Sequence, residues 1–292
     1  MAAVGRQQGL TPGARRFGVI GSPIRHSLSP LLHRTAYAVL GREDVVYERF
    51  EVPAGGLAAF LTAGEGRGLD GASITMPGKP EAFALAELQD GTSARLGIAN
   101  TLLRLPGGGF RAENHDVHGI VATLRDHGVR EPAVGAVIGS GATALSAVAA
   151  LLDLGARQLL LTARTRSKLA PLSELARAAG ARVTVVPWGD AAQVLAADVV
   201  ISALALEGAT GLADAWHRTG VSDVPAVFMD VLYDPWPAPL ACLLGAAGSE
   251  IADGLEMLVH QADMQLRSML GIREAPRAEM LAAARAHLTD RA

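Results

Sequence analysis

The segment GSGATA at 139–144 constrains the fold more than any other feature of the sequence. It follows an apolar run, AVGAVIG at 133–139, and precedes an alanine-rich segment, ATALSAVAALLDLG at 142–155. The glycines permit a tight turn and let a phosphate approach the backbone, and the small Ala144 allows a helix to pack closely on a strand. Free N–H groups at the start of such a helix attract an anion. This order of strand, loop and helix is typical of a dinucleotide-binding lobe, and the alternative is a plain glycine turn.

Short apolar runs alternate with helix-length amphipathic segments along the whole chain, which is the pattern of strand–helix–strand units. A chain of 292 residues is long enough for two hydrophobic cores, so we predict an α/β protein with two lobes. No strand follows the last two predicted helices, which either cap the second lobe or cross back to the first. Strands are predicted at 17–21, 45–50, 71–75, 133–139, 157–163, 182–187, 198–204 and 226–232, and helices at 30–40, 142–155, 255–270 and 277–288.

The residues after the second strand of the glycine-loop lobe indicate which dinucleotide binds. An NAD site places Asp or Glu there to accept from the ribose 2′-hydroxyl, whereas an NADP site needs cations for the 2′-phosphate. The chain reads ARTRSK at 163–168, without a carboxylate. Arg164 can pair with a phosphate and Thr165 can donate a hydrogen bond to it. The sequence therefore favours NADP, and a solvated basic helix start is the other interpretation.

Charge, cysteine content and hydropathy exclude several classes of protein. The formal net charge of −3 gives no long-range attraction to nucleic acid or to an anionic membrane. The single cysteine, Cys242, excludes an intrachain disulfide and fits a reducing cytoplasm, and its apolar surroundings predict a buried position in a helix. We find no signal-peptide run and no stretch of roughly 18 uncharged apolar residues that would span a membrane. We expect a cytoplasmic protein with a flexible N-terminal tail over 1–16 and small molecules as partners.

Several further motifs follow one another along the chain. They are GSPIRHSLSPLLH at 21–33, SITMPGK at 73–79, ANT at 99–101, ENHD at 113–116, the GSGATA and ART segments, DVLYDPWPAPL at 230–240 and GLEMLVHQA at 254–262. Through the order and spacing of these motifs, the chain from about Phe17 to Leu270 resembles the shikimate dehydrogenase family.

The resemblance implies a fold and an activity. An N-terminal substrate-binding lobe would comprise 17–117 plus 254–292, and a C-terminal Rossmann-type NADP-binding lobe would comprise 118–253. The last helices would then pack back on the first lobe. The activity implied is the reversible NADP-dependent reduction of 3-dehydroshikimate to shikimate, carried out by a monomer or a homodimer.

The resemblance also implies roles for individual residues. Lys79 and Asp116 match the family's catalytic lysine and its partner aspartate. Met257 matches a family position near the nicotinamide, but a methionine in a helical apolar stripe is more often part of the core. The residues that match substrate-binding positions are Ser27, Ser29, Thr75, Asn100, Tyr233 and Gln261. Those that match cofactor-binding positions are Gly139, Ser140, Gly141, Ala142, Thr143, Ala163, Arg164, Thr165, Lys168, Val231, Gly254 and Met257.

The chemistry of the implied reaction needs such residues. Hydride delivered to a ketone leaves an alkoxide, so the ammonium of Lys79 can supply the proton. A neighbouring carboxylate stabilises the charged lysine but hinders proton loss in the reverse direction, so either Lys79 alone or the unit of Lys79 and Asp116 carries the proton. Ser29 followed by Pro30 predicts a helix N-cap whose hydroxyl and positive helix end face a substrate carboxylate. A capping serine without a ligand is the alternative for Ser29, and it explains Ser27 less well.

The chain departs from the family pattern at a few positions. It has His115 where the family most often has threonine between the asparagine and the aspartate. His115 and His118 flank Asp116, so a metal site is an alternative. The resemblance gives Asp116 another role, and we predict no metal. The other departures are Arg34 for asparagine, Leu204 and Ala205 for Thr-Pro, and Ala238 for threonine.

Two further functions are compatible with the motifs. One is a relative on the same scaffold that acts on quinate or aminoshikimate. The other is a non-catalytic sensor that binds NADP without turnover. The joint presence of Lys79, Asp116, Asn100 and Gln261 argues against a sensor, because a sensor needs no proton donor.

Overall fold

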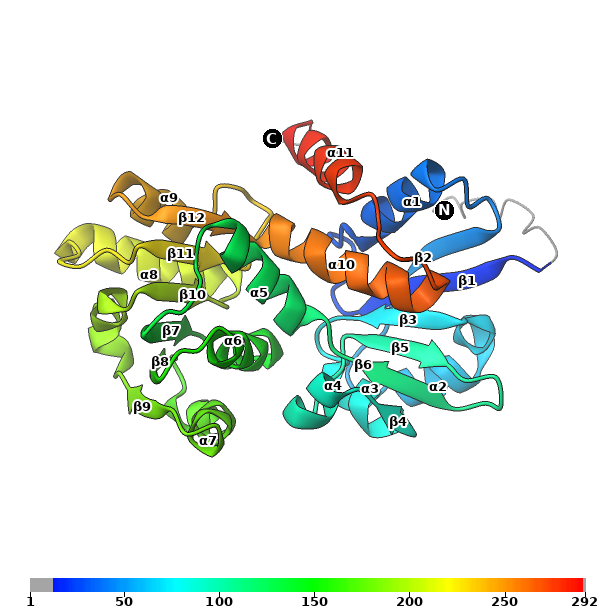
Figure 1. The fold of residues 1–292 in the computed structure, drawn as a ribbon, viewed down its shortest axis with the longest axis horizontal. Helices are drawn as coiled ribbons and strands as arrows, with labels where there is room; N and C mark the ends of the chain where they lie inside the picture. The colour runs from blue at the N-terminus through cyan, green and yellow to red at the C-terminus, as the bar shows by residue number, and fades with distance from the viewer. Residues whose placement is uncertain (1–12, 291–292) are drawn as a thin grey trace, which may run out of the picture.

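The computed structural model describes residues 13–290, which form two six-stranded sheets joined by helices that run between them (Figure 1). The first sheet is mixed, with the order β2-β1-β3-β5-β6-β4. β1 is parallel to both β2 and β3, and β5 is antiparallel to β3 and β6. The strands are β1 (Arg15–Gly21), β2 (Val45–Glu51), β3 (Gly71–Ile74), β4 (Leu88–Gln89), β5 (Thr101–Arg104) and β6 (Phe110–Glu113). Between them lie α1 (Ser29–Val39), α2 (Leu57–Thr62), the 3-10 helix η1 (Gly64–Gly68), α3 (Lys79–Leu85) and α4 (Gly91–Leu96).

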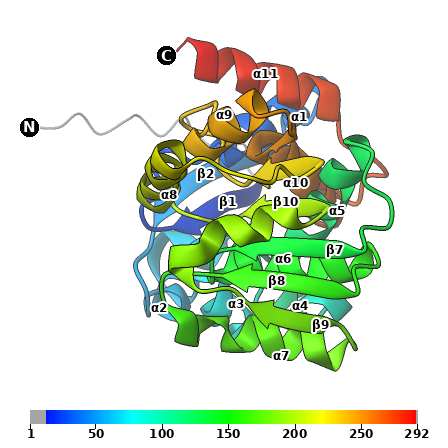
Figure 2. The same ribbon diagram turned by 90° about the vertical axis from the view of Figure 1, so that its left-hand side faces the viewer.

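The second sheet is entirely parallel and has the order β12-β11-β10-β7-β8-β9, which is the strand order of a Rossmann fold (Figure 1). Figure 2 shows its strands β10, β7, β8 and β9 from the side. The order reverses between β7 and β10, so a crevice is expected at the carboxyl ends of these two strands. The strands are β7 (Val134–Ile138), β8 (Gln158–Thr162), β9 (Arg182–Val185), β10 (Val199–Ser202), β11 (Val227–Asp230) and β12 (Glu250–Asp253). The helices are α6 (Ala142–Asp153), α7 (Ala170–Ala178), α8 (Leu206–Thr219) and α9 (Pro239–Ala246), with 3-10 helices η2 (Arg166–Leu169) and η3 (Trp188–Ala196).

Two helices connect the two lobes, and a third packs on the first lobe. α5 (Asp116–Asp126) leads out of β6, and α10 (Gly254–Leu270) leads back from β12 across the first sheet, beside α5 (Figure 1). α11 (Arg277–Thr289) packs on α1. Leu266 of α10 and Met280 of α11 are buried in one core cluster with Phe17 of β1. The last helices therefore return to the first lobe, as the family resemblance implies.

The predicted strands and helices are all confirmed to within a few residues, and two predictions of position are wrong. The expected tail over 1–16 overlaps β1, because Arg15 and Arg16 pair in register with Val45 and Val46. Residues 1–12 of that tail lie outside the described part of the chain. Cys242 lies in α9 as predicted, but its side chain is exposed, because it falls on the solvent side of this helix. Within residues 13–290, no helix is both long enough and apolar enough to cross a bilayer.

Candidate active site

A cavity of about 300 Å³ lies where the carboxyl edge of the second sheet meets the first lobe. All eight predicted catalytic and substrate-binding residues line it, namely Ser27, Ser29, Thr75, Lys79, Asn100, Asp116, Tyr233 and Gln261. Four of the predicted cofactor-binding residues line it as well, namely Thr143, Val231, Gly254 and Met257. Residues from both ends of the sequence thus share one cavity.

The topology of the first sheet explains why these residues meet. Thr75 follows β3, and Asn100 precedes β5, which is antiparallel to β3. Asp116 follows β6, which is antiparallel to β5. The carboxyl ends of β3 and β6 and the amino end of β5 therefore lie at one edge of the sheet. That edge faces the second lobe.

Lys79 and Asp116 form a buried ion pair in this cavity. Lys79 Nζ lies 2.5 Å from Asp116 Oδ2, and the two residues are 8% and 5% exposed. Burial of two opposite charges is costly unless further hydrogen bonds satisfy them, and Asn100 Nδ2 supplies one by donating to Asp116 Oδ1 at 2.8 Å. Lys79 and Asp116 are therefore a buried, paired set of charges and not two separate surface charges.

Asn100 connects the ion pair to α10. Its Nδ2 group also donates to Gln261 Oε1 at 2.9 Å, and its Oδ1 atom accepts from the backbone N–H of His115 at 3.0 Å. An amide held on both sides by such partners has one orientation. The side chains of Asn100, Gln261 and Asp116 therefore form one network of fixed orientation in the cavity wall.

Ser27 and Ser29 line the same cavity from the start of α1 and the loop before it. α1 begins at Ser29, with Leu28 at its N-cap and no side-chain cap, so the prediction that Ser29 caps the helix is wrong. Pro30 occupies the next position, where it preorganises the helix without losing a hydrogen bond. The Ser29 hydroxyl is thus not used in capping. Ser27 Oγ accepts from the N–H of Ser29 at 3.4 Å, and both serines line the cavity.

Tyr233 of the second lobe and Gly254, at the start of α10, border the same cavity. Burial raises the pKa of Tyr233, so its phenol stays protonated and can donate a hydrogen bond. Gly254 is the first residue of α10, and a Cβ there would overlap the carbonyl oxygen of Val231. Glycine is therefore required for α10 to start this close to the end of β11.

The glycine loop lies between β7 and α6. Gly139 has a φ of +131°, and a Cβ there would lie 2.7 Å from the carbonyl oxygen of Ala203, so this position also requires glycine. Gly141 is the N-cap of α6, and a Cβ built on it would meet no atom within 4 Å among the described residues. The first backbone N–H of α6 with a partner in the helix is that of Leu145, which donates to the carbonyl oxygen of Gly141, so the N–H groups of residues 142–144 have no partner in the helix. Space and donors thus fit a phosphate group.

The basic segment after β8 lies at the same edge of the second sheet. The side chains of Arg164, Thr165 and Lys168 are exposed, and none of the ion pairs within residues 13–290 involves them. Ala163 differs, because its side chain is 5% exposed and packs in the core. The residues after the strand therefore present unpaired cations within the described chain, which fits a phosphate.

The two histidines beside Asp116 do not gather around it. The His115 imidazole lies against Glu113, at 3.0 Å, while His118 lies on the exposed face of α5. Within residues 13–290 there is no group of three or more side chains arranged to hold a metal ion. Arg34, another departure from the family pattern, donates twice to the carbonyl oxygen of Tyr47 and so links α1 to β2.

Two buried polar residues of the cavity were missed from the sequence. Ser73 lies two positions before Thr75, so it shares a face of the extended chain with it, and Gln265 lies one helical turn after Gln261. These spacings could have identified both residues. Ser73 Oγ donates to Gln265 Oε1 at 2.9 Å and accepts from the hydroxyl of Tyr47 at 2.6 Å. Burial raises the pKa of Tyr47, which keeps that donor protonated.

Known proteins resemble this chain along almost its whole length. The family model for "Shikimate dehydrogenase substrate binding domain" matches residues 19–102. A shikimate dehydrogenase (NADP(+)) of Dinoroseobacter shibae is 35% identical over 273 residues, covering 91% of this chain and 96% of the relative. The crystal structure of Mycobacterium tuberculosis shikimate dehydrogenase is 38% identical, with a TM-score of 0.81 over 93% of this chain and 99% of that one.

A second solved structure was determined with ligands. Shikimate 5-dehydrogenase from Thermus thermophilus, in complex with NADP(H) and shikimate, is 26% identical to this chain. It has a TM-score of 0.77 and covers 93% of this chain and 99% of its own. Since relatives of more than 30% identity cover over nine-tenths of this chain, it belongs to the shikimate dehydrogenase family.

Proposed function

We propose that this protein catalyses the reversible NADP-dependent reduction of 3-dehydroshikimate to shikimate. The observation that carries the proposal is the buried ion pair of Lys79 and Asp116. The pair lies in a cavity that is lined by polar groups of the first lobe and by residues of the second. Relatives at 30% identity or more that span over nine-tenths of the chain are named as shikimate dehydrogenases (NADP(+)). NADPH, when bound, supplies the hydride.

Lys79 holds the proton at the reacting oxygen. Its ammonium polarises the ketone and donates as charge develops on the oxygen, and Asp116 keeps it charged and in place. Burial of both residues strengthens this interaction, because the local dielectric is low. The unit of Lys79, Asp116 and Asn100 therefore handles the proton, while the hydrogen bond from Asn100 fixes the carboxylate.

The remaining residues orient the substrate and the cofactor. Ser27 and Ser29 donate to the substrate carboxylate, Thr75, Asn100 and Gln261 bind the ring hydroxyls, and Tyr233 closes the cavity. The residues assigned to the cofactor phosphates are Gly139, Ser140, Gly141, Ala142, Thr143, Arg164, Thr165 and Lys168. Val231, Gly254 and Met257 border the space for the nicotinamide, and Ala163 supports the end of β8. The domain boundaries that accompany this assignment are 17–117 plus 254–292 for the substrate and 118–253 for NADP, and we place the enzyme in the cytoplasm.

An absorbance assay at the nicotinamide band tests the activity directly. Shikimate and quinate are each combined with NADP and with NAD, and the four rates are compared. Oxidation of shikimate with NADP should be the fastest. A faster rate with quinate would assign the protein to a different substrate, and the absence of turnover with every combination would favour a sensor.

The carboxylate assignment predicts a specific defect in Ser27→Ala. A hydroxyl that donates to a charged acceptor contributes about 1.5 to 3 kcal/mol, so KM for shikimate should rise roughly ten- to hundredfold. The KM for NADP should not change. Ser22→Ala is the matched control, because Ser22 lies in the same loop but bonds to Glu51 outside the cavity. An unchanged KM for shikimate in Ser27→Ala would place the carboxylate elsewhere.

A further inference from the structure

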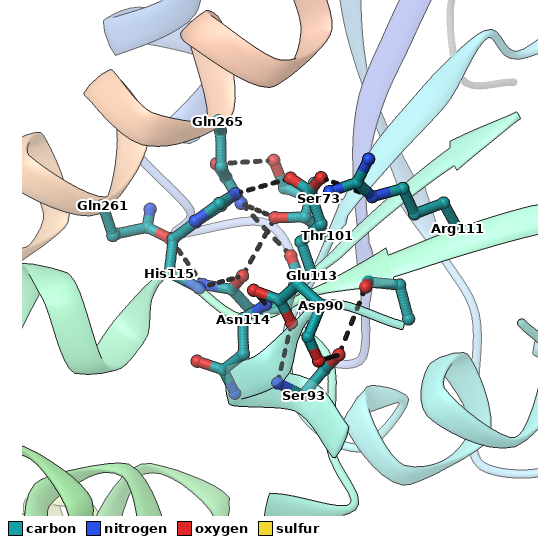
Figure 3. A network of polar contacts seen from close by, with 12 residues as sticks. Ser73, Asp90, Ser93, Thr101, Arg111, Glu113, Asn114, His115, Gln261 and Gln265 are labelled. Carbon is teal, nitrogen blue, oxygen red and sulfur yellow. Dashed lines mark hydrogen bonds and ion pairs between the residues drawn. The ribbon is translucent and has the colours of Figure 1, made fainter. Parts of the chain in front are cut away.

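Two buried residues near the end of β6, Glu113 and His115, lie close to Asp116 in the chain without lining the cavity. Figure 3 shows them together with Arg111. Glu113, the last residue of β6, is 4% exposed, and His115 is 6% exposed. Glu113 Oε2 lies 3.0 Å from His115 Nε2, and Glu113 Oε1 lies 3.0 Å from Nε of Arg111. Unlike Glu113 and His115, Arg111 is not buried, because its side chain is 50% exposed.

The charge on Glu113 determines how this contact works. Burial alone raises the pKa of Glu113, but hydrogen bonds from His115 and Ser268 outweigh burial, so its pKa lies below the usual value. Glu113 is therefore a carboxylate, which can only accept hydrogen bonds. His115 must then carry a proton on Nε2 and donate it to Glu113. The contact is a charge-assisted hydrogen bond in a buried place, where such bonds are strongest.

This hydrogen bond holds together the turn over residues 113–116, which positions Asp116. His115 is the N-cap of α5, and Asp116 is the first residue of that helix. The N–H of His115 donates to Asn100 Oδ1 at 3.0 Å, and Asn100 Nδ2 donates to Asp116 Oδ1 at 2.8 Å. The position of the His115 backbone is thus coupled to the orientation of Asn100 and to the carboxylate that holds Lys79.

We propose that Glu113 and His115 are a positioning pair, which sets the orientation of Asp116 and Asn100 and through them the ammonium of Lys79. The inference rests on the proposed function, in which Lys79 donates the proton. Neither residue touches the cavity, so the pair acts through Asp116 and Asn100 alone. The exposed Arg111 forms an ion pair with the Glu113 carboxylate but does not bond to His115, so its replacement offers a matched control.

Steady-state kinetics with shikimate and NADP provide the first test. A displacement of about 1 Å at a catalytic group can cost a hundredfold, so kcat of His115→Ala and Glu113→Gln should fall roughly ten- to hundredfold. The KM values for shikimate and NADP should stay near those of the wild type. His115→Gln keeps a donor toward Glu113 and should recover much of the loss. Arg111→Ala removes only an exposed ion pair and should stay within about twofold of the wild type.

Chemical labelling of lysine provides a test that does not depend on turnover. The chain has only two lysines, and Lys168 is exposed and distant from the turn, so it is an internal reference. Acetic anhydride acetylates free amines, and peptide mass spectrometry gives the ratio of labelling at Lys79 to labelling at Lys168. The ratio should rise severalfold in His115→Ala and Glu113→Gln, and should not change in Arg111→Ala.

The outcomes separate the inference from the proposed function. A wild-type protein without shikimate turnover would refute the function, and the labelling ratio would still decide whether the pair positions Lys79. Wild-type kcat together with an unchanged labelling ratio in Glu113→Gln would overturn the inference. If His115→Ala fails to fold, Glu113→Gln, which has nearly the same shape, decides alone.

Discussion

Replacement of Lys79 by alanine should reduce turnover of shikimate roughly a hundred- to ten-thousandfold, which is the usual contribution of general acid–base catalysis. Among the described residues, Lys79 is the only lysine or arginine in the cavity wall, and its ammonium is held 2.5 Å from Asp116. Apart from His26, no other described side chain of that wall can carry a positive charge. The affinity for NADP should be nearly unchanged. The measurement is kcat for shikimate oxidation, with the dissociation constant of NADP determined by fluorescence titration.

Two further variants separate charge from volume. Lys79→Met keeps much of the length of the side chain without the ammonium, so it should lose as much turnover as Lys79→Ala. Asp116→Asn leaves a buried ammonium without its counter-charge, and its effect should not add to that of Lys79→Ala, because the two residues act as a unit. Turnover of Lys79→Ala within a few-fold of the wild type would show that another group carries the proton.

Preference for NADP over NAD should depend on Arg164. The guanidinium is exposed and free of ion pairs within the described chain, so it can form charge-assisted bonds to a 2′-phosphate. One such bond contributes about 1.5 to 3 kcal/mol, or roughly ten- to hundredfold in affinity. The wild type should prefer NADP by at least that factor. Arg164→Ala should remove most of the preference, and Arg164→Asp should lower it further, because it adds a like charge against the phosphate.

The measurement is the ratio of kcat/KM with NADP to kcat/KM with NAD. The substitution is made at position 164 and not at Ala163, whose side chain is buried and where a carboxylate would be costly. Arg177→Ala is the matched control, since it removes an exposed arginine of α7 in the same lobe. An unchanged ratio in Arg164→Asp would mean that the segment after β8 is only a solvated helix start.

The sequence alone determined the class of fold and most of the candidate site. Hydrophobic periodicity located the strands and helices, because it reports which face of each element is buried. The glycine loop and its flanking segments identified the dinucleotide lobe, because few residues other than glycine fit such a turn. The ordered motifs then named most of the polar residues around the Lys79 ion pair, but not Ser73 and Gln265.

Tertiary structure decided the features that depend on neighbours far apart in the chain. Periodicity could not show that α11 packs on α1, that Cys242 lies on the exposed side of α9, or that β1 extends back to Arg15. It could not show that the histidine at 115 turns away from Asp116 and toward Glu113. A residue pattern encodes which side of an element is buried, but the partner of a buried polar group is fixed only when the elements pack together. The ion pair of Lys79 and Asp116, and the hydrogen bonds that hold it, therefore exist only in the folded chain.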